Sequence, residues 1–329
     1  MAARQTAPVI GALATCGDES AQSASRLHGF SVTIGYRYQS SFRHFIGTVE
    51  QKQRELLGTQ IVNDYHLFDV AVEYQLSRRW SIMGSLPVLN ATRYQLYNPK
   101  GTYHVAGIGD ATIGARAWLF RGPAESGGNV ALGFSLKMPT GKSDSRDNAT
   151  LANGTPVLAV ADQSIQAGDG GWGFALDVQA YRPLPVFQRT TMYFAGTYLF
   201  NPTDTNGVAT FRSRPSESIM SVSDQYLFRG GLAHGVPKIR GLSASFGGRI
   251  EGVPVRDAFG ASNGFRRPGY SISIDPGISY ARGRYALSVN APWAVERNRR
   301  RSVPDIADGR HGDAAFADYA IITSFTRHF

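Results

Sequence analysis

From residue 30 to the C-terminus, the sequence alternates between apolar side chains and polar or small ones. At the start of this region Phe30, Val32 and Ile34 share one parity, and Ser31 and Thr33 share the other. Successive side chains of a β-strand point to opposite faces, so the pattern predicts strands with one apolar and one polar face. About twelve such segments are present, at 30–38, 68–76, 80–89, 108–120, 129–138, 172–182, 190–200, 223–235, 242–251, 270–281, 285–294 and 316–329.

The connections between these segments are alternately short and long. Short ones lie at 77–79, 121–128, 183–189, 236–241 and 282–284, and long polar ones at 40–64, 90–107, 139–171, 201–222, 252–269 and 295–315. This order is typical of an up-and-down barrel with turns at one rim and loops at the other. We therefore predict an all-β fold, an antiparallel up-and-down transmembrane β-barrel of about 12 strands. Its long loops are extracellular, and its short turns and both termini are periplasmic.

The polar faces carry too many charges for a packed core. Only 18% of the residues are charged, yet eleven of these lie on the polar parity, and burying them unpaired is costly. They are our candidates for lining a wet lumen: Arg37, Asp69, Glu73, Arg116, Lys137, Asp177, Arg229, Arg249, Glu251, Asp275 and Asp318. An inverted, soluble barrel with an apolar core is the alternative. No apolar run reaches the roughly 20 residues of a spanning helix, which excludes a helical membrane protein.

The two ends of the chain differ from its body. Residues 1–28 are expected to form a leader, and residues 29–329 a single barrel domain. The leader contains a weak signal-like segment; a start codon placed too far downstream and lipidation of Cys16, the only cysteine, are both open interpretations. In the last strand Phe325 and Phe329 share the apolar parity, and the chain ends on the aromatic residue. This ending resembles the signal by which bacterial outer-membrane barrels are recognised by their assembly machinery.

Three glycine-centred motifs occur in a fixed order, at 107–116 (GIGDATIGAR), 136–141 (LKMPTG) and 168–173 (GDGGWG). Together they are similar to signatures of the outer-membrane barrel family labelled "MetA-pathway of phenol degradation". The resemblance covers about residues 105–200 by motif. It implies passage of small, often aromatic, molecules across an outer membrane. Either these motifs only shape the barrel, or Lys137 or Arg116 also contacts the solute.

The sequence shows no signature of catalysis or of a metal site. It has no G-x-S-x-G motif and no histidine pair at metal-ligand spacing, so we expect no catalytic residue, cofactor or metal. An outer-membrane hydrolase with a Ser–His pair on neighbouring strands remains an alternative. Four acids of loop 139–171 lack the regular spacing of a calcium loop: Asp144, Asp147, Asp162 and Asp169.

Two of the long connections carry unusual side chains for surface loops. The apolar stretch 157–161 suggests that loop 139–171 packs into the lumen as a plug, with disorder as the alternative. The last long loop carries a basic cluster, which is interpreted as a constriction, a contact to lipopolysaccharide phosphates or a solvated tip. This cluster consists of Arg297, Arg299, Arg300 and Arg301.

The expected function follows from barrel size and charge. Twelve strands lie between eight, whose interior is filled, and sixteen, which leave an open channel, so a narrow pore is predicted. The lumen candidates are nearly balanced in charge, which argues against a strongly ion-selective porin despite the net charge of +9. We expect a monomer for passive uptake of a small organic solute, in contact with outer-membrane lipid and lipopolysaccharide and with no nucleic acid. A scaffold that acts through its surface loops is the competing hypothesis.

Overall fold

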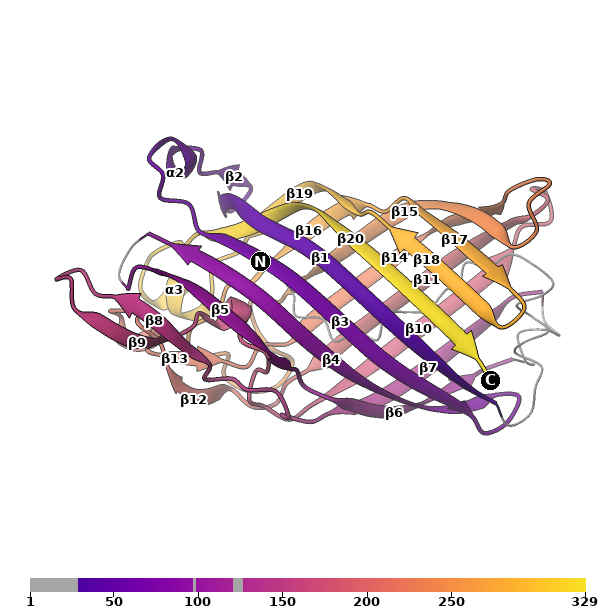
Figure 1. Ribbon diagram of the computed structural model, residues 1–329, viewed down its shortest axis with the longest axis horizontal. Coiled ribbons are helices and arrows are strands. Elements are labelled where there is room, and N and C mark those ends of the chain that lie inside the picture. The colour runs from indigo at the N-terminus through magenta and orange to yellow at the C-terminus, as the bar shows by residue number, and fades with distance from the viewer. Residues whose placement is uncertain (1–28, 97–98, 121–126) are drawn as a thin grey trace.

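The computed structural model describes residues 29–96, 99–120 and 127–329 (Figure 1). The predicted leader, with Cys16, lies outside the described residues. In the described part of the chain no helix is long and apolar enough to cross a membrane.

Twelve strand lines close into one antiparallel barrel, and β20 pairs with β1 to complete the ring. Nine lines are single strands: β1 (Phe30–Ile46), β3 (Val62–Gln75), β4 (Trp80–Gln95), β7 (Asn129–Lys137), β10 (Gly173–Pro183), β11 (Thr190–Phe200), β14 (Gln225–Gly235), β15 (Leu242–Val253) and β20 (Ala314–His328). Each of the other three is broken once: β5 (Gly101–Ile108) with β6 (Thr112–Trp118), β16 (Gly269–Ile274) with β17 (Gly277–Arg282), and β18 (Tyr285–Asn290) with β19 (Trp293–Arg299). The predicted strand number and up-and-down order are confirmed.

Strand β7 illustrates which face of the wall is apolar. Phe134 is 54% exposed and Leu132 is 48% exposed, whereas Ala131 and Lys137 are almost fully buried. The same alternation runs through the neighbouring strands, so the apolar face of the barrel is the outer one. The inverted, soluble interpretation is therefore wrong, and the barrel is of the transmembrane type.

The three strand breaks were not expected from the alternation, which predicted continuous strands at 108–120, 270–281 and 285–294. Two breaks contain a proline, which has no N–H to donate to the sheet. At these two positions the ladder continues through single hydrogen bonds, from Ala291 N to the Pro276 carbonyl at 3.0 Å and from Ala320 N to the Pro292 carbonyl at 3.1 Å. The third break, at residues 109–111, lies within the first glycine-centred motif.

The predicted long connection 90–107 is wrong. Strands β4 and β5 continue as a hairpin, because the buried side chains of Tyr103 and Val105 on β5 pack against the folded loop 139–171. Apolar contacts with loop 139–171 thus stabilise β4 and β5 within the segment that was predicted to be a loop.

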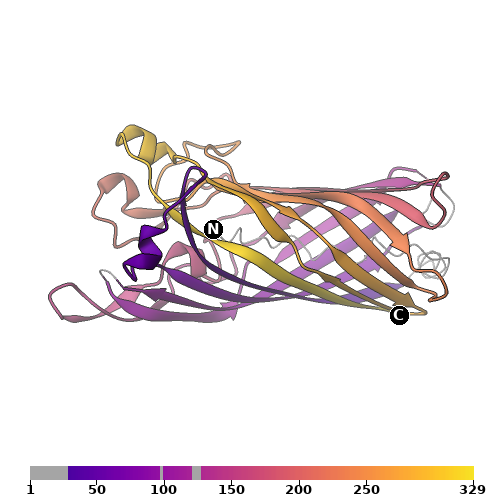
Figure 2. The same ribbon diagram turned by 90° about the horizontal axis from the view of Figure 1, so that it is seen from above.

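The two ends of the barrel differ, as Figures 1 and 2 show. The C-terminus and the short turns lie at one end, where the Phe329 ring stacks on Phe30 with centroids 4.4 Å apart. The long connections gather at the other end and hold small elements: β2 (Val49–Glu50), α2 (Gln53–Leu56), β8 (Arg146–Thr150), β9 (Pro156–Val160), η2 (Gln163–Ile165), β12 (Thr205–Ala209), η3 (Pro215–Glu217), β13 (Ile219–Ser221) and α3 (Val303–Ala307). The long-loop end is therefore a folded layer over the barrel mouth.

Candidate functional site: a charge-paired lumen beneath a folded loop

The charged candidates for the lumen are largely paired with one another. Ten of the eleven form an ion pair with another described residue, and Asp69 is buried. On one wall Glu251 binds Arg37 at 2.6 Å and Arg249 at 2.9 Å, while Asp275, in the break between β16 and β17, lies 3.2 Å from Arg229. Pairing offsets the cost of removing these charges from water.

The pair between Arg37 and Glu251 crosses the lumen. Arg37 is on β1 and Glu251 on β15, and three strand lines separate these strands in the ring. At about 4.8 Å per strand, the two strands are roughly 19 Å apart along the wall. A side-chain contact of 2.6 Å over that separation requires the side chains to meet inside the barrel. The pair therefore narrows the channel.

A second group lies on β3, β6 and β10. Arg116 is 3.3 Å from Asp177 and 3.6 Å from Glu73. Gly133 on β7 is the register partner of both Arg116 and Asp177, and a Cβ at this glycine would overlap the Asp177 carboxylate. The glycine thus lets two long side chains from flanking strands meet across β7.

The three glycine-centred motifs converge at one junction. The Asp110 carboxylate accepts a hydrogen bond from the backbone N–H of Gly141 and another from that of Asp169, both at 3.0 Å. The Asp169 side chain is in turn paired with Lys137. A Cβ added at either Gly141 or Gly168 would overlap the other glycine's backbone. The motifs therefore fix the two ends of loop 139–171 to the wall where β5 gives way to β6.

The returning limb of this loop, directly after β9, is held at the long-loop end of the barrel. Asp162 accepts two hydrogen bonds from Arg267, at 2.8 and 2.7 Å, and lies 3.4 Å from Arg93 on β4. Burial alone would raise the pKa of Asp162, but the two guanidinium groups hold it well below its usual value. The Asp162 carboxylate also accepts the Ser164 N–H at the start of η2. We call these contacts the Asp162 clasp.

Apolar packing supports the same arrangement. Ile165 of η2 and Ala159 of β9 are fully buried in a cluster with Tyr65, Leu89 and Val105 of β3, β4 and β5. Part of the apolar stretch 157–161 is thus packed against the barrel wall. Sequence reasoning missed the Asp162 clasp, because its partners lie 105 and 69 positions away and have no shared motif.

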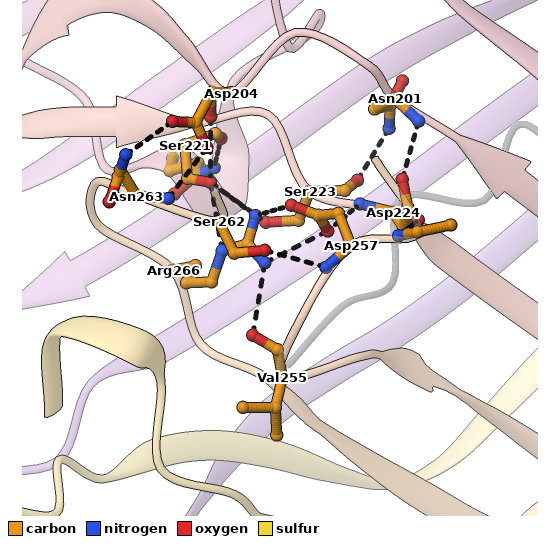
Figure 3. A network of polar contacts seen from close by, with 12 residues as sticks. Asn201, Asp204, Ser221, Ser223, Asp224, Val255, Asp257, Ser262, Asn263 and Arg266 are labelled. Carbon is orange, nitrogen blue, oxygen red and sulfur yellow. Dashed lines mark hydrogen bonds and ion pairs between the residues drawn. The ribbon is translucent and has the colours of Figure 1, made fainter. Parts of the chain in front are cut away.

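A further polar network joins the loops 201–222 and 252–269 (Figure 3). Arg266 and Asp257 form an ion pair in which both side chains are 1% exposed. Arg266 also donates to the Ser221 hydroxyl at 2.8 Å, and Asp224 accepts the Asn201 backbone N–H at 2.7 Å. This network stiffens the loop layer that faces Asp162.

The predicted basic loop cluster is split by the structure. Arg297 and Arg299 belong to strand β19 rather than to the last long loop, which corrects the prediction. Arg297 donates to the Ala317 carbonyl at 3.0 Å, and Arg299 is 2% exposed and pairs with Asp305 at 2.9 Å. Arg301 hydrogen-bonds the Arg310 and Asp305 carbonyls, and Arg300 is exposed. Three of the four arginines therefore make contacts within the protein, and a solvated loop tip is wrong for Arg297, Arg299 and Arg301.

The acids of loop 139–171 are dispersed. Asp162 and Asp169 are paired with cations, Asp147 accepts the His104 N–H at 2.7 Å, and Asp144 is exposed. No group of three or more His, Cys, Asp or Glu in the described part of the chain is arranged to hold a metal ion.

Comparison with known proteins supports the fold. No model of a known protein family matches the chain, and no curated protein matches it in sequence. Among solved structures it is similar to an outer membrane channel from Pseudomonas putida F1, with 11% identity, a TM-score of 0.64, and coverage of 92% of this chain and 96% of that one. The fold is that of an outer-membrane β-barrel.

Two other barrels superimpose on this outer-membrane barrel fold with TM-scores under 0.5. The beta domain of the Bordetella autotransporter BrkA has a TM-score of 0.49 and 11% identity, and covers 92% of this chain and 100% of that one. The monoaromatic hydrocarbon channel CymD has a TM-score of 0.47 and 10% identity, and covers 94% of this chain and 91% of that one.

Proposed function

We propose that this protein is a narrow channel of a Gram-negative outer membrane for passive uptake of small organic solutes, aromatic ones included. The observation that carries the proposal is the mutual pairing of the lumen charges beneath a loop that is clasped across the barrel. A lumen with five basic and six acidic candidates, ten of them in ion pairs, offers no strong fixed charge to select ions. Uncharged solutes are the class that suits such a channel.

Membership of the family labelled "MetA-pathway of phenol degradation" is part of this proposal. Its support is the three motifs and their meeting at the Asp110 junction. In this arrangement the long loops face the cell exterior, and the exposed Arg300 contacts lipopolysaccharide. The terminal Phe325 and Phe329 serve recognition by the assembly machinery, and the channel acts as a monomer without a catalytic residue or cofactor.

Planar-bilayer recording of the purified protein tests the proposal. We expect small conductance steps and a reversal potential near zero across a potassium chloride gradient, because paired charges favour neither ion. Swelling of proteoliposomes in small neutral solutes should be faster than in larger sugars. A strongly ion-selective pore would contradict the solute class. A protein that neither conducts nor passes neutral solutes would favour the scaffold hypothesis.

A further inference from the structure

The short-turn end of the barrel carries a one-sided charge. Among the described residues, nine exposed cationic side chains lie there, and turns 76–79, 184–189, 236–241 and 283–284 include no Asp or Glu. We call this set the basic rim: Arg78, Arg79, Arg182, Arg189, Lys238, Arg240, Arg282, Arg284 and Arg327. Without these nine, the chain's 34 basic residues become 25, which equals the number of acidic residues. The number of cations in the basic rim therefore equals the net charge of the chain, +9.

The basic rim differs from the long-loop end in how its charges are satisfied. At the long-loop end buried or half-buried arginines have carboxylate partners, as in the pairs of Arg54 with Asp313 and Arg299 with Asp305. In the basic rim, leaving Arg78 aside, no side chain forms an ion pair with another described residue. A ring of like charges repels itself unless anions from outside the protein neutralise it.

Two rim cations lie on the outer face of the wall, at the level of exposed aromatic residues. Arg282 on β17 and Arg327 on β20 flank Tyr285 of β18 in the sheet register. The Arg327 guanidinium lies 5.8 Å from the Tyr285 ring centroid and 4.4 Å from that of Phe329. Arg327 shares the outer parity with Phe325, which is 42% exposed. Tyrosine and arginine beside one another on an outer wall are typical of the boundary between hydrocarbon and head groups.

We propose that the basic rim binds anionic phospholipid head groups of the leaflet that surrounds it, an inference that rests on the membrane location in the proposed function. A guanidinium group matches a phosphodiester with two parallel hydrogen bonds. The cations are spread over four turns and the ends of β10, β17 and β20, which suits a ring of separate lipids better than one acidic protein on a contiguous patch. The outward positions of Arg282 and Arg327 place them beside the bilayer rather than in the pore.

Native mass spectrometry of the full chain in detergent tests the proposal with two lipids of identical acyl chains, phosphatidylglycerol and phosphatidylethanolamine. Wild-type protein should retain phosphatidylglycerol in preference. The triple variant Arg282→Gln/Arg284→Gln/Arg327→Gln should lose that retention by roughly a hundredfold, because each of the three arginines near an anionic surface contributes about fivefold in affinity. The matched control is Lys52→Gln/Lys142→Gln/Arg256→Gln, which removes three exposed cations of the long-loop end; it should behave as wild type.

Equal retention of the two lipids by wild type would overturn the proposal and redirect the search to an acidic protein partner. Equal loss in the rim and control variants would overturn it as well, because net charge rather than the rim would then be responsible. Heat-modifiable gel migration checks that each variant is folded. Should the triple variant not fold, Arg284→Gln alone, in an exposed turn, should still lower phosphatidylglycerol retention. Lipid retention requires no conductance, so failure of this proposal and failure of the channel are distinguishable.

Discussion

Substitution of Asp162 is expected to release loop 139–171 from the barrel mouth. Asp162→Ala removes the carboxylate that accepts both hydrogen bonds from Arg267 and pairs with Arg93. It leaves the anchor at Asp110 intact, since that junction uses other residues. The matched control is Asp144→Ala, which removes an exposed acid from the same loop.

The size of the effect follows from burial. The side chains of Asp162, Arg267 and Arg93 are 12%, 14% and 3% exposed. Removing one partner of a buried ion pair costs about 3–5 kcal/mol, and we take the lower limit because water still reaches two of these groups. A cost of about 3 kcal/mol raises the ratio of released to clasped loop by roughly a hundredfold. A loop that is clasped nearly all the time in wild type would then open frequently.

Two measurements check this prediction. Single-channel recording should show larger or longer openings for Asp162→Ala than for wild type, whereas Asp144→Ala should match wild type. Limited trypsin digestion should cut faster after the exposed Arg146 of the loop in Asp162→Ala. A folded Asp162→Ala protein with unchanged conductance and unchanged cleavage would refute the reasoning that the clasp holds the loop.

Four further outcomes are expected. Unboiled protein should migrate anomalously on gels and fractionate with the outer membrane; recovery as a detergent-free cytosolic monomer would contradict this. Phe134→Arg on the lipid face should cost about 2–4 kcal/mol of folding into lipid, far more than Ser135→Arg on the inner face, and similar effects would mean that the faces are misassigned. Deletion of residues 144–166 should increase conductance or solute flux, and equal flux would reject the plug. Finally, burial raises the pKa of Asp313, but the hydrogen bond from His44 and nearby positive charges, including that of Arg54, together outweigh burial and lower this pKa to about 2. The stabilisation of the folded protein is therefore complete above the unfolded pKa near 4 and is lost towards pH 2. In thermal unfolding, Asp313→Asn should destabilise the protein at pH 7 but not at pH 2. A destabilisation by Asp313→Asn that is the same at pH 7 and pH 2 would exclude the contacts of the ionised Asp313 carboxylate as its cause.

The alternation of side chains was sufficient for the barrel itself. Strand number, the outward apolar face and the charged inner face follow from period-two patterning, because each residue's face is decided by its immediate neighbours along a strand. Phe134 and Ser135 could be assigned to opposite faces without any knowledge of β10. The glycine-centred motifs could also be located, although their meeting point could not.

Only the tertiary structure decided which charges meet and where the long loop lies. Arg37 and Glu251 are 214 residues apart, and Asp162 and Arg267 are 105 apart; nothing in the local pattern of either residue encodes its partner. The strand breaks at Pro276 and Pro292 likewise depend on neighbouring strands that continue the ladder across the gap. Alternation is a local property, whereas closing the ring brings distant strands to the same height around one lumen. Pairing across that lumen therefore exists only once the barrel is closed.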